Sequence, residues 1–368
     1  MGLFLSFFVV YSGSMKMQEN IPLQDFTAFR TGGRARYFSR VKSIAELRKA
    51  VRFAKEKKLP FFVLGRGANL LIPDAGFSGL VIKMEMKGIR FKNTAFVRRT
   101  ANSGAARKKN DTAVAIARAG EDWDSFVAKT VWRKCAGLEN LSLIPSTVGA
   151  AAIGNIGAYG AEAKDIIFSV QALNTETMKI KKFSNKECNF GYRESFFKTN
   201  VGKKYIVTQV SFILKKKGKA RTEYKDVQEY FSQQKIIAPS LKNVRDAIIA
   251  IRTKKLPDIS KVGTAGSFFK NPIVSKRKAD ALKKEYPDLP IFALEEKRAK
   301  LSAGFLLDKI CGLKGYKKGN IGLWNKQALV LVNYGGGTTK EILLFAGDVK
   351  KSVKEKTGIK LEMEVQVI

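Results

Sequence analysis

The chain has 368 residues, 45% of them hydrophobic, which is enough for two or three domains around a substantial core. It contains no histidine, which excludes Ser-His-Asp and Cys-His catalysis, histidine-ligated metal sites and a histidyl-linked flavin. The three cysteines, Cys135, Cys188 and Cys311, form no CxxC pair. Neither a zinc knuckle nor a disulfide framework is therefore expected, and a reducing cytosol is favoured.

The formal net charge is +36, from 68 Lys and Arg against 32 Asp and Glu, so nucleic-acid binding is a hypothesis to consider. The basic residues are spread along the whole chain, and only residues 98–109 (RRTANSGAARKK) resemble a basic loop. We interpret most of the charge as a solvated, lysine-rich surface, with diffuse attraction for polyanionic ligands or RNA as the alternative.

Residues 1–18 form an N-terminal extension whose apolar run, Leu3 to Tyr11, is too short to span a bilayer. The extension also lacks the basic first region of a signal peptide. A true start at Met15 or Met17 is the favoured interpretation.

Residues 43–59 predict a helix, because apolar residues recur at helical spacing and Ser43 and Glu46 form a capping box. Pro60 ends the helix, and FFVLG then predicts a short buried strand that leads into the glycine turn GRGANLL at residues 65–71. This order suits an α/β unit that binds a phosphate on free backbone N–H groups. It is not a Rossmann fingerprint, because the third glycine and the immediate helix are absent.

Residues 79–91 and 113–119 alternate like strands, and residues 123–134 predict a helix. The small residues of 149–158 then leave space for a bulky planar group against the backbone. The alternative, a membrane packing motif of small residues, fails because no apolar span of about 20 residues surrounds it.

The residue pattern of the sequence changes after Gly218, and this change predicts a domain boundary near residues 215–222. Residues 243–252 and 338–356 predict two further helices, the second with a Thr338 and Glu341 capping box. The chain ends in a predicted strand with Leu361, Met363, Val365 and Val367 on one face and Glu362, Glu364 and Gln366 on the other.

The decapeptide GTAGSFFKNP, residues 263–272, presents the Ser267 hydroxyl in a tight position beside Lys270 and Asn271. Taken alone, the pattern fits equally well a glycine-rich turn between two strands. Glu364 alone is more often a surface carboxylate, and Arg193 in GYRES fits a routine salt-bridge partner. Spacing in the sequence does not show that these residues converge.

Six motifs together resemble the UDP-N-acetylenolpyruvoylglucosamine reductase family. They are GTAGSFFKNP, GRGANLL, LEMEV (361–365), IGNIGAYGAE (153–162), FGYRESFFK (190–198) and RTKKLPD (252–258). The resemblance runs from about Leu23 to the C-terminus. It implies an α+β fold with a two-part FAD-binding module of the vanillyl-alcohol-oxidase type and a C-terminal α/β substrate domain. The implied limits are 19–88 and 89–218 for the two FAD-binding subdomains and 219–368 for the substrate domain, whose last strand returns to the active site.

The activity implied by the resemblance has two half-reactions in one pocket. NADPH reduces a non-covalently bound FAD, and hydride then passes to the enolpyruvyl double bond of a UDP-sugar. The product is UDP-N-acetylmuramate, a peptidoglycan precursor, and the implied enzyme is a cytoplasmic monomer with no specific nucleic-acid partner. Arg193 and Glu364, the latter as a protonated donor, match the residues that steady the enolate charge. Ser267 matches the general acid that protonates the intermediate.

The resemblance also implies the binding residues. Tyr224, Lys255, Asn271 and Gln327 fall where the family binds uridine diphosphate, and the loop of Tyr224 is similar to a mobile tyrosine lid. The implied FAD-binding residues are Gly65, Gly67, Ala68, Asn69, Leu70, Ile144, Ser146, Thr147, Gly149, Asn155, Gly157 and Ala158.

Some residues depart from the family pattern. Ser146 replaces a usual glycine and Gly154 a usual glutamine, while Asp124 and Trp324 stand where histidines are frequent. If Ser146 has a positive φ, its side chain costs about 1 kcal/mol and crowds the flavin. A catalytically weak or cofactor-poor homologue is therefore an alternative.

Two other classes of protein are also alternatives. A nucleic-acid-binding protein fits the charge, but the chain has no helix-turn-helix, RNP-like or zinc-finger signature. A flavin oxidase of the same superfamily would have a different C-terminal domain. The motifs GTAGSFFKNP and LEMEV therefore argue against an oxidase.

Overall fold

The computed structural model describes residues 9–12, 15–93, 111–294 and 297–368. The chain divides into two compact units. The first comprises Met1–Glu19, Tyr37–Arg66 and Gly79–Lys254, and the second comprises Asn20–Arg36, Gly67–Ser78 and Lys255–Ile368. The basic stretch at residues 98–109 lies outside the described residues.

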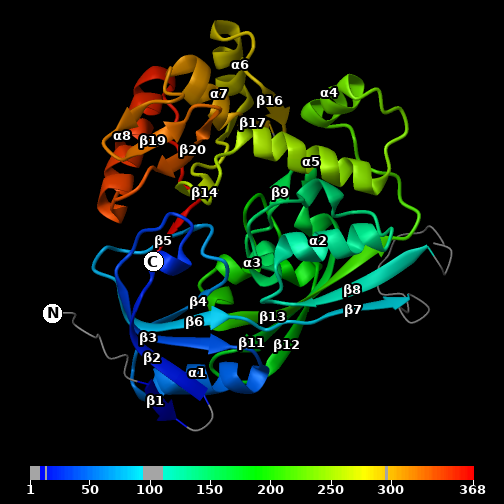
Figure 1. Cartoon of the computed structure of the whole chain (residues 1–368). Helices are drawn as coiled ribbons and strands as arrows, with labels where there is room; N and C mark the ends of the chain where they lie inside the picture. The colour runs from blue at the N-terminus through cyan, green and yellow to red at the C-terminus, as the bar shows by residue number, and fades with distance from the viewer. Residues whose placement is uncertain (1–8, 13–14, 94–110, 295–296) are drawn as a thin grey trace. The chain divides into compact units, whose positions relative to one another are not determined.

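The first unit contains a five-stranded sheet in the order β1-β2-β3-β6-β4 (Figure 1). Its strands are β1 (Val9–Ser12), β2 (Met15–Pro22), β3 (Arg34–Val41), β6 (Phe77–Met84) and β4 (Phe61–Leu64). Helix α1 (Ile44–Glu56) buries its apolar face in the core beside this sheet. The Ser43 hydroxyl oxygen accepts a hydrogen bond from the Glu46 N–H, but the Glu46 carboxylate accepts from the backbone N–H of Lys42 rather than that of Ser43. Half of the predicted capping box therefore forms.

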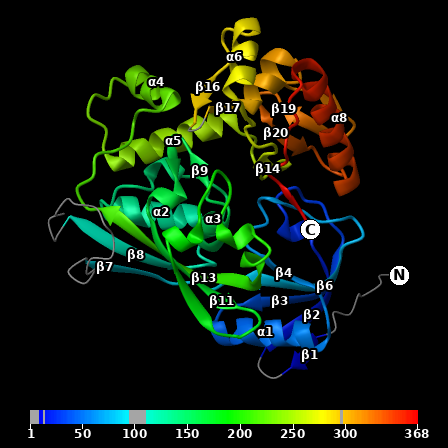
Figure 2. The same ribbon diagram turned by 180° about the vertical axis from the view of Figure 1, so that it is seen from behind.

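A second, antiparallel sheet of the first unit has the order β12-β11-β13-β8-β7. Its strands are β12 (Ile180–Ser184), β11 (Ile167–Asn174), β13 (Tyr205–Lys215), β8 (Thr112–Arg118) and β7 (Ile89–Asn93). Helices α2 (Trp123–Trp132) and α3 (Val148–Ile153) lie on one face of it in both views (Figures 1 and 2). The rings of Phe126 and Phe212, 4.9 Å apart, join α2 to β13.

The rest of the first unit includes the hairpin of β9 (Gly157–Ala158) and β10 (Ala161–Glu162). Helix α4 (Lys225–Gln233) packs against α5 (Leu241–Lys255) through a small core that contains Val227, Phe231, Val244 and Ile248. The short 3₁₀ helices are Glu139–Leu141, Ala163–Asp165, Lys186–Cys188, Phe196–Lys198 and Gly202–Lys204.

The second unit has a four-stranded sheet in the order β14-β20-β19-β18, with α8 (Thr339–Thr357) beside β19 and β20 (Figure 2). Its strands are β14 (Gly263–Ser267), β20 (Gln327–Asn333), β19 (Ile321–Trp324) and β18 (Lys317–Lys318). A smaller sheet contains β15 (Ile273–Ser275), β17 (Arg298–Leu301) and β16 (Ile291–Ala293). The remaining helices are Gln24–Phe26 (3₁₀), α6 (Lys276–Glu285), α7 (Ala303–Phe305) and the π-helix Leu306–Ile310.

The helices predicted from the sequence are confirmed, and the capping box of Thr338 and Glu341 forms at the start of α8. The last strand was predicted too long. Only β21 (Gln366–Val367) is a strand, and it pairs parallel with β5 (Leu70–Leu71). Met363 instead forms an antiparallel bridge with Phe269. The segment changes its pairing partner between Met363 and Gln366, and the chain bends there. The predicted alternation of buried and exposed side chains therefore does not continue to the end of the chain, and Val367 is 44% exposed.

The two units do not settle the domain limits expected from the sequence. Strand β13 ends at Lys215, at the start of the predicted boundary region 215–222, while α4 and most of α5 belong to the first unit. The limits at residues 18, 88 and 218 stay a prediction.

Candidate functional site

Ser267 and Glu364 lie close together along the backbone of the second unit. Ser267 is the last residue of β14, directly after Gly266. The φ of Gly266 is +74°, which favours glycine, and the residue stands at an irregularity in the pairing with β20. The next residue, Phe268, accepts a hydrogen bond from the Glu364 N–H at 2.8 Å. Phe268 and Phe269 are fully buried, so the segment that carries Ser267 is anchored in the core.

The glycine turn is linked to the same C-terminal segment. The Asn69 side-chain amide donates to the Glu364 carbonyl at 3.1 Å, and the Gln366 N–H donates to the Asn69 carbonyl at 3.1 Å. Leu70 lies in β5 opposite Gln366, and Ala68 lies between Gly67 and Asn69 in the same turn. The second unit thus brings residues 67–71 of the glycine turn and LEMEV together, a contact that the spacing of the motifs in the sequence does not show.

Gly67 is required by geometry. Its φ is +71°, and a Cβ at this position would lie 1.9 Å from the Phe26 carbonyl oxygen. The Gly67 carbonyl accepts from the Ala28 N–H at 2.9 Å, which fixes the turn against the N-terminal segment of the unit.

Arg193 lies in the first unit, within the segment after the 3₁₀ helix Lys186–Cys188. Its φ is +58°, a left-handed conformation that is uncommon for a residue other than glycine. The guanidinium donates to the Gly157 carbonyl at 3.0 Å. This bond joins Arg193 to β9, the hairpin strand that contains the predicted FAD residues Gly157 and Ala158.

A cavity of about 620 Å³ opens in the first unit beside two other predicted FAD residues, Gly65 and Thr147. A Cβ on Gly65 would lie 2.9 Å from the Thr147 hydroxyl oxygen, so these segments approach each other closely. The full lining is Lys42, Gly65, Arg66, Lys83, Met84, Glu85, Lys87, Gly120, Asp122 and Thr147.

The charges of this cavity favour an anion. Four cationic side chains face two carboxylates, and Arg66 forms an ion pair with Asp122. Lys83 donates to the Gly65 carbonyl, and burial lowers the pKa of its ammonium below the usual value. Sequence reasoning missed Lys83, although a lysine within the apolar run GLVIKM was a usable signal. The glycine cradle and the excess positive charge fit the diphosphate of FAD.

Other predicted FAD residues have structural roles in the first unit. Gly149 is packed so closely that a Cβ would lie 2.8 Å from Ala119 Cβ. Asn155 is fully buried, and its amide donates to the Gly191 carbonyl and the Glu162 carboxylate while its oxygen accepts from the Lys164 N–H. Ile144 is partly buried against the core.

The predicted substrate residues Asn271 and Gln327 both lie beside α7 in the second unit. The Asn271 side-chain oxygen accepts from the Ala303 N–H at 2.9 Å. A Cβ on Gly304 would lie 3.1 Å from the Gln327 side-chain oxygen. Lys255 is the last residue of α5 and begins the C-terminal segment of the second unit, Lys255–Ile368.

Tyr224 precedes α4 in the first unit and is 40% exposed. Its ring meets that of Tyr159 edge-on, with the centroids 5.2 Å apart. Burial raises the pKa of Tyr159 to about 12, although the positive charge of Arg252 acts in the opposite direction. Tyr159 and Arg252 were missed from the sequence, although both lie inside motifs that were recognised.

Comparisons with known proteins agree along the chain. Residues 35–182 match the family described as FAD binding domain, and residues 258–368 match the C-terminal domain of UDP-N-acetylenolpyruvoylglucosamine reductase. A protein of that name from Flavobacterium johnsoniae is 40% identical over 355 residues, which cover 96% of this chain and 100% of the relative. The Pseudomonas aeruginosa protein is 38% identical and covers 95% of this chain and 98% of its own length. The chain belongs to the UDP-N-acetylenolpyruvoylglucosamine reductase family.

A solved structure of the family supports the fold. The reductase from Thermus caldophilus superposes with a TM-score of 0.62 at 24% identity, covering 96% of this chain and 99% of that one. The expected α+β class, with an FAD-binding module followed by a C-terminal domain, is confirmed.

Two departures from the usual family pattern are accommodated in the first unit. Ser146 does not have a positive φ, so the backbone strain that such a φ would cause is absent. Its hydroxyl donates to the Thr147 carbonyl. Asp124 forms a bidentate ion pair with Arg245 at 2.7 and 2.8 Å. It also accepts from the Leu143 N–H. These bonds outweigh desolvation and lower the pKa of Asp124.

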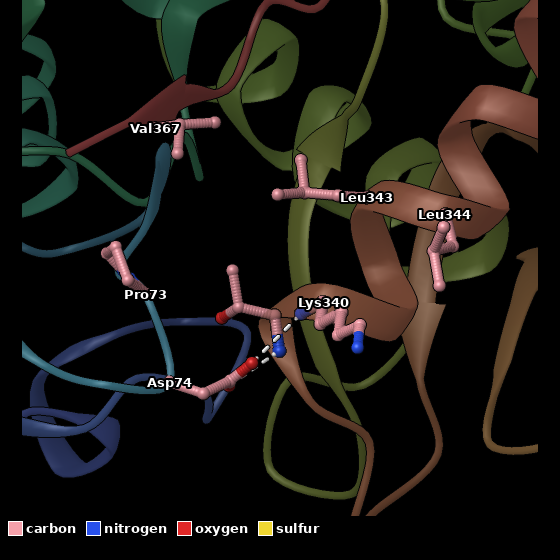
Figure 3. Close-up of a pocket in the computed structure, with 7 residues that line it drawn as sticks. Pro73, Asp74, Lys340, Leu343, Leu344 and Val367 are labelled. Carbon is pink, nitrogen blue, oxygen red and sulfur yellow. Dashed lines mark hydrogen bonds between the residues drawn. The ribbon is translucent and has the colours of Figure 1, made fainter.

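A smaller cavity of about 350 Å³ lies in the second unit, beside α8 and β21 (Figure 3). Asp74 accepts from the backbone N–H groups of Thr339 and Lys340 at 2.8 and 3.0 Å, so a carboxylate already caps the positive end of α8. Leu343, Leu344 and Val367 make the rest of the lining mainly apolar. None of the predicted site residues lines it.

Within the described part of the chain, no helix is both long and apolar enough to cross a membrane. Across the same residues, no group of three or more Cys, Asp and Glu side chains is placed to hold a metal ion.

Proposed function

We propose that this chain catalyses the reduction of UDP-N-acetylglucosamine enolpyruvate to UDP-N-acetylmuramate, with FAD as cofactor and NADPH as the hydride source. The main support for this proposal is the backbone hydrogen bond that joins the Ser267 and Glu364 segments, in a chain that belongs to the family. The cationic, glycine-lined cavity beside Gly65 and Thr147 supports the cofactor.

Bound FAD would accept hydride from NADPH and deliver it to the enolpyruvyl carbon, leaving an enolate next to the substrate carboxylate. In our proposal the Arg193 guanidinium and the Glu364 carboxyl group stabilise that charge. The Ser267 hydroxyl then gives its proton to the adjacent carbon and so completes the saturated lactyl ether.

The proposed substrate contacts follow the chemistry of the nucleotide. Lys255 meets the diphosphate as a point charge, while Asn271 and Gln327 offer amide donors and acceptors to uracil or phosphate. The common position of Asn271 and Gln327 beside α7 supports this assignment. Tyr224 is proposed to contact the diphosphate from its loop.

For FAD we propose the backbone of residues 65–70 around the pyrophosphate. The isoalloxazine side would be formed by the segment from Ile144 to Ala158, including Ser146, Thr147, Gly149, Asn155 and Gly157. Because the Asn155 side chain is occupied by protein partners, its contact with the cofactor would be made through the backbone.

We also propose a monomer that works in the cytoplasm, with no specific nucleic-acid partner. The three cysteines that the structure describes are buried thiols, which suits a reducing compartment. The net charge of +36 is then a property of the solvated surface.

An anaerobic absorbance experiment tests the function. Purified protein is mixed with FAD, then with NADPH, then with the enolpyruvyl UDP-sugar. The flavin band should bleach with NADPH and return with the sugar. A band that bleaches but does not return would contradict the substrate, and a protein that retains no FAD would contradict the cofactor.

A further inference from the structure

The loop that precedes Tyr224, residues 217–223, has little support from its own backbone. Between described residues, no backbone–backbone hydrogen bond involves this loop. Lys217 and Lys219 are exposed, whereas Arg221 is only partly exposed. Such a segment would be free to take many conformations unless side chains hold it.

Asn140 holds this loop from the core of the first unit. It lies in the 3₁₀ helix Glu139–Leu141 and is 2% exposed. Its amide nitrogen donates to the Tyr159 carbonyl at 3.0 Å and to the Arg221 carbonyl at 3.2 Å. Both amide hydrogens are therefore used, and one side chain joins the loop to the turn that carries Tyr159.

Two further contacts lie beside this link, one made by Tyr224 and one by Arg221. The Tyr159 ring meets the Tyr224 ring edge-on at 5.2 Å, with an interplanar angle of 79°. Arg221 reaches the Asp165 carboxylate at 3.4 Å. Tyr159 has a φ of +48° and packs, partly buried, against the small core of α4 and α5, so the ring that meets Tyr224 is itself supported.

We propose that Asn140 is a positioning residue for Tyr224: it fixes the loop at residues 217–223 and holds the Tyr224 ring against Tyr159 before substrate binds. A loop that is already ordered loses less conformational entropy on binding, so the affinity for substrate is higher. The kinetic part of this inference rests on the proposed role of Tyr224. The structural part does not.

Limited digestion with trypsin tests the structural part on FAD-loaded protein. The initial rates of cleavage after Lys217, Lys219 and Arg221 are measured by mass spectrometry. Asn140→Ala should raise these rates about tenfold, because the loop then opens more often. Asn185→Ala is the matched control, since its amide also donates to two backbone carbonyls, those of Lys164 and Ile167 at 2.9 and 2.7 Å. Equal cleavage in wild type and Asn140→Ala would overturn the proposal.

Steady-state kinetics test the positioning role. Asn140→Ala should raise the KM for the UDP-sugar about tenfold with kcat nearly unchanged, and flavin reduction by NADPH should keep its rate. A fall in kcat with an unchanged KM would contradict the positioning role. If wild type itself lacks activity, the proposed function fails while the trypsin result still decides the loop contact. If Asn140→Ala does not fold, Asn140→Leu replaces it, because leucine has a similar volume but no amide hydrogens to donate to the Tyr159 and Arg221 carbonyls; unchanged cleavage there overturns the proposal as well.

Discussion

The Glu364 N–H donates to the Phe268 carbonyl at 2.8 Å, which places the C-terminal segment beside the residue that follows Ser267. Asn69 adds a side-chain bond to the Glu364 carbonyl at 3.1 Å, so the glycine turn, the serine strand and the chain end form one hydrogen-bonded group. A change in any of these segments should therefore affect the other two.

Ser267→Ala should leave flavin reduction by NADPH unchanged and slow the oxidation of reduced flavin by the UDP-sugar roughly 10²- to 10⁴-fold. The reason is that only the second half-reaction needs the proton that the hydroxyl donates. Anaerobic stopped-flow absorbance separates the two steps, and the NADPH step is the control within the same variant. Equal slowing of both steps would exclude the general-acid role.

Lys255→Ala should raise the KM for the UDP-sugar much more than it lowers kcat, by about tenfold for the loss of one charge-assisted contact. Lys254→Ala is the matched control, because Lys254 is the exposed neighbour in α5. If both variants change KM equally, the effect is one of general charge, and Lys255 does not bind the diphosphate.

Gly67→Ala should destabilise the protein by about 3 kcal/mol, because the new Cβ adds a clash with the Phe26 carbonyl to the strain of a positive φ. Gly319→Ala is the control for strain alone. Its φ is +58° and nothing lies within 4 Å of the added Cβ, so about 1 kcal/mol is expected. Urea denaturation of both variants measures the difference. A Gly67→Ala loss no larger than that of Gly319→Ala would show that the turn adjusts freely.

The parts of the fold that could be predicted depend on local signals. The capping box of Thr338 and Glu341 and the apolar spacing in α1 involve neighbouring residues, so the sequence predicts both helices. The final strand was predicted too long because its partner changes from Phe269 to β5, and no local pattern carries that information.

The site shows the same limit. Motif resemblance supplied Ser267 and Glu364, whereas Asn140 gains its importance from carbonyls 19 and 81 residues away. The concern over Ser146 came from residue type alone, and the observed backbone at that position removes its physical basis. Lys83 was overlooked because a lysine in a strand is usually solvated, while here it faces the Gly65 carbonyl.

The ionisation of the Tyr159 hydroxyl should make the free energy of unfolding depend on pH. Burial raises the pKa of its hydroxyl from 10.0 to about 12, so between these values the unfolded chain loses the proton while the folded chain keeps it. Unfolding is then favoured by rising pH: the contribution is fully present below pH 10 and is lost as pH rises toward 12. The complete loss is at most about 3 kcal/mol.

Tyr159→Phe removes this titration, so its free energy of unfolding should fall less steeply than that of wild type between pH 9 and pH 11. Urea denaturation at several pH values gives both slopes. Other tyrosines, lysines and the Cys188 thiol, whose pKa burial also raises to about 12, titrate in both proteins and cancel in the difference. Parallel slopes would mean that Tyr159 ionises as readily in the folded protein as in the unfolded chain, which its burial beside Tyr224 makes unfavourable.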